Sequence, residues 1–205
     1  EFMENNKLLE EVKIMIADPQ FNSDMEYRKD SLKGFRTKMK STVLPQIIID
    51  KFENEIRSNF PVGTHLRCRS STNNEDLEGF SGAGLYESYT HKMNEGTLDK
   101  SIKQVWSGLW TFRAFQEREF YRVDHFKVAM GVLIHPNYKN EKSNGVAVTK
   151  NIFDSDYRGY YVNVQLGEDM VTNPEENSIP EELLISVDGL GYGYGTEYVR
   201  YSNLV

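Results

Sequence analysis

The hydrophobic pattern of this chain changes once, from a helical period to a strand period, near residue 62. Before that point, apolar residues recur three or four positions apart, most clearly over residues 8–16 and 48–60. After it, Leu66 and Cys68 alternate with Arg67 and Arg69. Further strand-like runs cover residues 85–90, 127–134, 145–149, 160–165 and 183–187. Helices first and strands later predict an α+β fold with a largely antiparallel sheet, rather than alternating βαβ units.

The same pattern suggests where the chain divides. We expect residues 1–2 to be a cloning scar, residues 3–62 a helical N-terminal region, and residues 63–205 a second, strand-rich region. Ser23, with Glu26 three residues on, predicts a capping box for one of the early helices. Thr97 is expected to cap one long packed helix with an apolar stripe over residues 98–112. Residues 189–195 alternate glycine with aromatics, which fits a flexible terminus or a cut in a longer chain, and we favour the cut.

Composition excludes several classes of protein. The chain carries 24 Lys+Arg against 31 Asp+Glu, a net charge of −7, whereas a binder of duplex nucleic acid needs a basic face. Cys68 is the single cysteine, so an internal disulfide is excluded. No apolar run approaches the ~20 residues needed to span a bilayer. We therefore expect a cytoplasmic domain with no nucleic-acid or membrane partner.

The segment 67–84 carries the residues best suited to bind an anion. Arg67 and Arg69 lie on one face of the predicted strand, and a guanidinium suits bidentate contact with phosphate. Hydroxyls and amides follow at residues 70–74, and three glycines between residues 79 and 84 would let backbone N–H groups approach an anion. Alternatively, the arginines pair with Glu75 or Asp76 beside a glycine-rich hairpin. The residues alone leave both interpretations open.

Ordinary roles are expected for the other reactive side chains. Arg113, Arg118 and Arg122 lie late in the predicted long helix, where cations complement the helix macrodipole. Cys68 lies on an apolar strand face and is expected to be a small buried hydrophobe. The four histidines lack the spacing of metal ligands, which argues against metal binding by histidine. No Ser/His/Asp order is evident, and neither a metal ligand nor a catalytic residue is assigned within this chain.

Four segments, in order along the chain, resemble a known family. Residues 69–82 read Arg69-Ser-Ser-Thr-Asn-Asn-Glu-Asp-Leu-Glu-Gly-Phe-Ser-Gly82 and resemble the signature of the nucleotide-binding domain in phosphoenolpyruvate synthases, pyruvate phosphate dikinases and glucan water dikinases. Residues 105–114 resemble the family's helix that ends in Arg-Ala. Residues 145–151 and 161–171 are similar to its Gly-Val-x-Phe-Thr-Arg-Asn strand and its Asn-Ala-Gln-x-Gly-Glu-Asp segment.

The resemblance implies an ATP-grasp-like domain, of which residues 63–205 would be a part truncated at its C-terminus. In this family ATP lies between two α+β subdomains, and its β-phosphoryl group passes to a histidine on a separate swivelling domain. ATP and Mg²⁺ are therefore the implied cofactors of an intact parent phosphotransferase, whose remaining domains are partners and whose phosphoryl acceptor is unknown. The implied ATP-binding residues are Arg69, Ser70, Ser71, Gly82, Ala83, Gln165 and Glu168, whereas Arg113 is implied to be structural.

The sequence departs from the family at two places. No Gly-Gly-Lys-Gly segment precedes Arg69. The family's adenine hinge falls at residues 131–136, where Pro136 has no N–H to donate. A second hypothesis is therefore a non-catalytic binding module that keeps the scaffold without nucleotide turnover.

Overall fold

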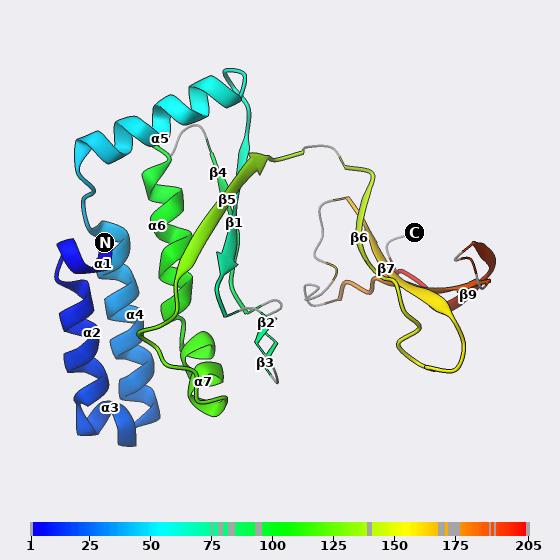
Figure 1. Ribbon diagram of the computed structural model, residues 1–205, viewed down its shortest axis with the longest axis horizontal. Helices are drawn as coiled ribbons and strands as arrows, with labels where there is room; N and C mark the ends of the chain where they lie inside the picture. Colours follow the sequence, from blue (N-terminus) through cyan, green and yellow to red (C-terminus); the bar gives the residue numbers. More distant parts are fainter. Residues whose placement is uncertain are drawn as a thin grey trace. The chain divides into compact units, whose positions relative to one another are not determined.

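The chain forms two compact units, Glu1–Asn137 and Tyr138–Val205 (Figure 1). The computed structural model describes the backbone of residues 2–74, 76–77, 80–81, 85–92, 96–138, 141–167, 171, 177–188, 190 and 192–203. It confirms the predicted α+β class, with helices first and antiparallel strands later. Within the described residues, every helix is too short or too polar to cross a bilayer.

The first unit begins with helices, as the helical period predicts. Their bounds are α1 Phe2–Asn5, α2 Leu8–Ala17, α3 Pro19–Ser23, α4 Met25–Ser41 and α5 Gln46–Asn59. The expected cap at Ser23 is wrong by one residue, because Asp24 caps α4 by accepting hydrogen bonds from the backbone N–H groups of Glu26 and Tyr27. Ser23 instead ends α3, and its hydroxyl donates to the Pro19 carbonyl.

A three-stranded antiparallel sheet follows in the order β4-β1-β5, with β1 Leu66–Thr72 at its centre. β4 covers Tyr89–His91 and β5 covers Met130–Pro136, and a short hairpin of β2 Asp76–Leu77 and β3 Phe80–Ser81 lies between β1 and β4 in sequence. The strand expected over residues 85–90 is therefore shorter and later. Pairing with β5 keeps β1 extended as far as Thr72.

The predicted long helix is divided. It consists of α6 Asp99–Ser107, the 3₁₀ turn η2 Gly108–Trp110, and α7 Phe112–Phe120. The break is at Thr111, whose ψ of 149° is extended and whose hydroxyl accepts a hydrogen bond from the Ala114 N–H. Thr111 is thus the N-cap of a new helix. Thr97 makes no cap, since its hydroxyl bonds to the Asp99 carboxylate instead.

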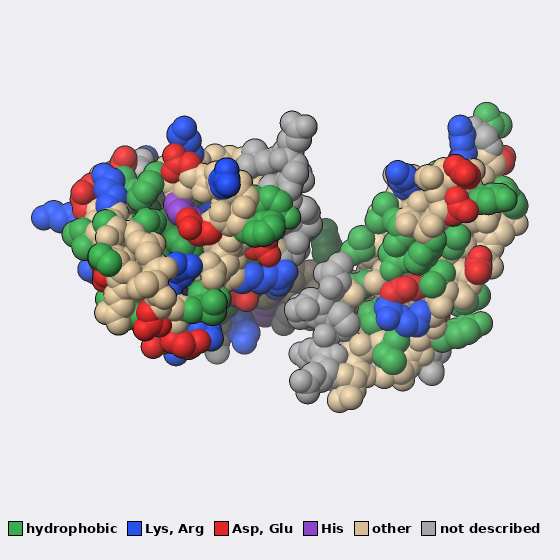
Figure 2. Space-filling model, turned by 90° about the horizontal axis from the view of Figure 1, so that it is seen from below, with side chains coloured by type: hydrophobic (Ala, Val, Ile, Leu, Met, Phe, Trp, Pro, Cys, Tyr) green, Lys and Arg blue, Asp and Glu red, His purple; other side chains and the backbone are tan. Residues whose placement is uncertain are grey.

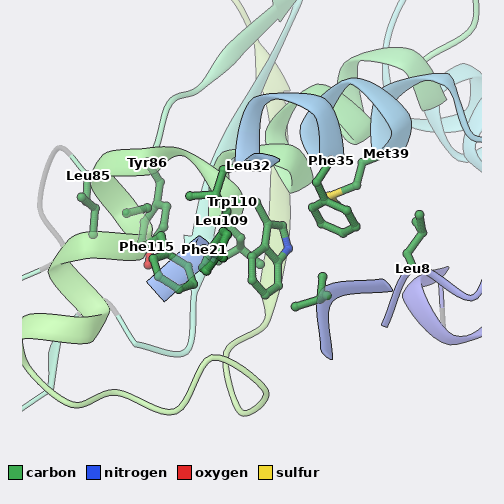
Figure 3. Packing of buried hydrophobic residues seen from close by; sticks show 12 residues of the cluster. Leu8, Phe21, Leu32, Phe35, Met39, Leu85, Tyr86, Leu109, Trp110 and Phe115 are labelled. Atoms are coloured by element: carbon green, nitrogen blue, oxygen red, sulfur yellow. The ribbon is translucent and has the colours of Figure 1, made fainter. Parts of the chain in front are cut away.

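Two hydrophobic clusters hold the first unit together. The larger joins α2, α3 and α4 to η2 and α7 (Figure 3). In it, Phe21 meets Phe115 edge to face at 5.3 Å, and Phe35 meets Trp110 in the same way at 5.5 Å. The smaller cluster lies between α6 and one face of the sheet, and its buried members are Leu66, Cys68, Leu98, Ile102 and Val105.

The second unit is an antiparallel sheet in the order β6-β7-β8-β9. The strands are β6 Ser143–Val148, β7 Gly159–Leu166, β8 Glu181–Val187 and β9 Gly193–Arg200. Residues 193–195, for which a flexible terminus was one of the two alternatives, form part of β9 and pair with β8. Val171, Pro180 and Val187 are the buried apolar residues of this unit among those described. Hydrophobic side chains spread over its visible face (Figure 2).

Candidate functional site

β1 has one face covered by α6 and one open face. Leu66 and Cys68 point toward α6, where both are buried. Burial raises the pKa of the Cys68 thiol to about 11 against a weaker opposing effect of Arg67. The thiol is therefore protonated at neutral pH and unsuited to act as a nucleophile, which confirms the expectation of a small buried hydrophobe.

Arg67 and Arg69 lie on the open face, as the alternation predicts. Arg67 is half-buried and donates a hydrogen bond to the Thr90 hydroxyl, with 2.6 Å between Nη1 and Oγ1. Arg69 is exposed, and among the described side chains its guanidinium has no hydrogen-bond or ion-pair partner. Glu75 and the side chain of Asp76, the acidic partners considered from the sequence, lie outside the described residues.

The register of β1 and β5 decides which residues accompany Arg69. Ser71 is paired with Gly131 and Arg69 with Leu133, and all four are exposed on the open face. Gly131 approaches β1 closely, since a Cβ there would lie 3.3 Å from the Ser71 carbonyl oxygen. Arg69 and Ser71 therefore share an accessible surface that carries positive charge.

Ser70 points the other way. It lies on the face turned toward α6, and its hydroxyl donates to the Tyr86 carbonyl at 3.4 Å. Of the three predicted site residues on β1, Arg69 and Ser71 are thus together, whereas Ser70 ties the strand to the segment that precedes β4.

The other predicted site residues lie elsewhere in the chain. Gln165 is in β7 of the second unit, where its side chain is buried and its amide nitrogen donates to the Ser178 hydroxyl at 2.6 Å. Its amide oxygen accepts from the Leu166 N–H and the Ser202 hydroxyl. Gly82, Ala83 and Glu168 lie outside the described residues.

The described part of the chain holds no cluster of metal-ligating side chains. No group of three or more His, Cys, Asp or Glu side chains there is placed to hold a metal ion.

Arg118 is the polar residue whose role the sequence interpretation missed. It lies in the last turn of α7, as the macrodipole argument requires, but its side chain is 0% exposed. Its guanidinium donates to the Leu109 carbonyl at 2.6 Å and to His125 Nδ1 at 3.0 Å. The sequence does contain a pattern that indicates its burial. Arg118 follows Ala114 by four residues and Phe115 by three, and this spacing places it on the same, buried face of the helix.

The neighbour of Arg118 is a neutral histidine. Burial lowers the pKa of His125, the Arg118 charge lowers it further, and a hydrogen bond to Glu119 opposes both. Since Nδ1 accepts from Arg118, Nε2 carries the proton and donates to the Glu119 carboxylate at 2.7 Å. The imidazole stacks on Phe115, with ring centroids 4.1 Å apart.

Comparison with known proteins assigns the family. The sequence profile described as "Pyruvate phosphate dikinase, AMP/ATP-binding domain" matches residues 1–186. The phosphoenolpyruvate synthase of Pyrococcus furiosus is 28% identical over 155 residues, which are 73% of this chain and 19% of that protein. The probable phosphoenolpyruvate synthase of Methanocaldococcus jannaschii is 24% identical over 196 residues, 91% of this chain and 16% of that protein.

A relative without an assigned substrate also matches. An uncharacterized phosphotransferase of Bacillus subtilis, YvkC, is 26% identical over 143 residues, 67% of this chain and 17% of that protein. The chain thus spans less than a fifth of the length of these relatives. Because the family profile covers far more than half of the sequence, the chain belongs to the family of pyruvate phosphate dikinase AMP/ATP-binding domains, as its four ordered segments predict.

Proposed function

We propose that this chain binds ATP and that Arg69 contacts the phosphates from the open face of the sheet β4-β1-β5. The observation that carries the proposal is the placement of Arg69, which is exposed and unpartnered among the described residues, in a chain of an AMP/ATP-binding family. A guanidinium that is not engaged by a carboxylate keeps its full hydrogen-bonding fork for a phosphate.

The neighbours of Arg69 have supporting roles in this proposal. Arg67 is held by Thr90 and adds a second positive charge to the open face. Ser71 offers a hydroxyl on the same face. Phosphoryl transfer depends on neutralising and positioning phosphate charge, and these side chains supply that without acting as a base. Gly82, Ala83, Gln165 and Glu168 stay predicted contributors.

The wider activity is proposed by analogy with the family. The chain would be the nucleotide-binding part of a longer phosphoenolpyruvate-synthase-like phosphotransferase, in which the phosphoryl group passes through a histidine on another domain to an acceptor that is not identified. Mg²⁺ as a cofactor of that parent, and a cytoplasmic location, stay predictions.

Isothermal titration of the 205-residue chain with MgATP at fixed ionic strength tests the proposal. We expect saturable binding that Arg69→Gln weakens by about 10- to 100-fold, the loss of one charge-assisted hydrogen-bonding group. Arg113→Gln is the matched control, since Arg113 is also exposed in the first unit, and it should bind within about twofold of the unmodified chain. Absence of binding, or equal affinity of the two variants, would contradict the proposal and favour a scaffold without nucleotide binding.

A further inference from the structure

Asn74 and Tyr86 are joined to each other although twelve residues separate them in the sequence. The Asn74 amide nitrogen donates to the Tyr86 hydroxyl at 3.0 Å, and both side chains are buried. Asn74 follows the end of β1, and Tyr86 precedes β4. Together with the bond from the Ser70 hydroxyl to the Tyr86 carbonyl, this attaches Tyr86 to the end of β1 through both its side chain and its backbone.

Arg118 connects this attachment to the helices. Its Nη1 lies 3.5 Å from the Tyr86 hydroxyl, while Nη2 donates to the Leu109 carbonyl of η2. The guanidinium also lies over the Trp110 ring, 5.5 Å from its centroid. Burying a guanidinium costs free energy unless its N–H groups are hydrogen-bonded. These partners therefore hold the Arg118 guanidinium in one position.

His125 sets the orientation of that guanidinium. The ring accepts from Arg118 Nε on one side and donates to Glu119 on the other, and stacking on Phe115 holds its plane. Each group in the chain of contacts therefore has its partner, from Glu119 through His125, Arg118 and Tyr86 to Asn74. Buried polar networks rigidify the segments that they join, and here Arg118, His125, Tyr86 and Asn74 are all buried.

We propose that Arg118 is a positioning residue for nucleotide binding, acting through Tyr86 and Asn74 to hold the end of β1 that carries Arg69 and Ser71. The inference rests on the proposed function. Phosphate contacts need to be held close to their productive geometry by neighbours that do not touch the ligand, because small displacements of a binding group lose much of its contribution. Ser70, predicted as a ligand, belongs to this supporting set.

The test removes the hydroxyl group through which the network reaches Asn74 and keeps the packing of the aromatic ring. Tyr86→Phe deletes the hydroxyl that Asn74 and Arg118 contact. Ser107→Ala is the matched control, since Ser107 is also fully buried in the first unit and its hydroxyl bonds only locally, to the Gln104 carbonyl. We expect Tyr86→Phe to raise the Kd for MgATP about 5- to 20-fold, and Ser107→Ala to leave it within about twofold.

Amide hydrogen exchange gives a readout that does not depend on ATP. Protection of residues 70–74 should fall in Tyr86→Phe while α6 stays protected. A second variant, Asn74→Ala, removes the other partner of the same hydrogen bond and so controls for an effect specific to the tyrosine. Because the two side chains act through that bond, the variant with both changes should bind ATP no more weakly than the weaker of the two single variants.

The outcomes separate the two proposals. If the unmodified chain binds ATP but Tyr86→Phe binds as well as Ser107→Ala, the positioning role is overturned and the proposed function stands. Additive losses in the double variant also overturn the positioning role. If the unmodified chain does not bind ATP, both proposals fail.

Discussion

A buried ion pair within α6, whose lysine also donates to the C-cap residue of α4, provides a quantitative test of the fold. The Lys103 ammonium lies 3.0 Å from the Asp99 carboxylate, with side chains only 7% and 6% exposed, and it also donates to the Thr42 carbonyl at 2.9 Å. Burial by itself raises the pKa of Asp99, but hydrogen bonds from Thr97 and Lys103, with the charges of Lys103 and Lys100, bring it below its ordinary value. Asp99 is therefore ionised in the folded state, and Lys103 contributes to stabilising its buried negative charge.

Lys103→Met keeps the aliphatic stem and removes the charge. Breaking one side of a buried ion pair costs about 3–5 kcal/mol because the remaining charge stays buried without compensation. We expect about 3 kcal/mol, the lower end, since the Thr97 hydroxyl still hydrogen-bonds to Asp99. Replacing both charges, as Asp99→Asn with Lys103→Met, should recover most of that loss.

Urea unfolding followed by tryptophan fluorescence measures the cost. The chain has 2 tryptophans, Trp106 and Trp110, and both lie in the first unit, so the signal reports on the unit that contains the pair. Lys29→Met is the control, because Lys29 forms an exposed pair with Glu26 and should lose less than about 0.5 kcal/mol. A loss below about 1 kcal/mol for Lys103→Met, or a double variant no more stable than the single one, would refute the reasoning.

Three further predictions concern the same unit. The pKa of His125 in the folded state lies below its unfolded value of about 6.5, so the unfolded state takes up the proton first as pH falls. The free energy of unfolding should therefore fall as pH drops from above 6.5 toward the lowered pKa. In urea titrations between about pH 5 and 8, His125→Gln should make the free energy of unfolding depend less on pH. Cys68 should react with a thiol reagent at pH 8 only after urea is added, and rapid reaction of the native chain would show that the strand face is not packed. Thr111→Ala should cost about 1 kcal/mol by removing the N-cap of α7, whereas Thr111→Ser should cost less, and equal stabilities would argue against a helix start at this residue.

Local pattern was sufficient to predict much of the fold. The alternation of Leu66 to Arg69 placed two arginines on the open face of β1, because side-chain direction in a strand follows from position alone. The break at Thr111 was not predictable in this way, since the apolar stripe of α6 continues at helical spacing into α7 and a capping threonine resembles a helical one. β9 was not predicted because the glycine-rich segment has little strand preference of its own. It is a strand because it pairs with β8, and that pairing exists only in the folded chain.

The candidate site shows the same limit. Arg69 was predicted from its residue type and its place in an ordered set of segments. The contacts of Arg118 join η2, α7, residue 125 and residue 86, which come together only in the folded unit. Sequence spacing can place Arg118 on a buried helix face, but it cannot specify those partners.

NMR of the arginine side chains during a titration with MgATP tests the central claim most directly. In the ¹⁵N-labelled chain, the Arg69 Nε–H resonance can be assigned by its loss in Arg69→Lys. We predict that this resonance shifts and saturates as ATP is added, while that of Arg113 stays in place. An Arg69 resonance that is unmoved when the chain is saturated with ATP would contradict phosphate binding at the open face of β1.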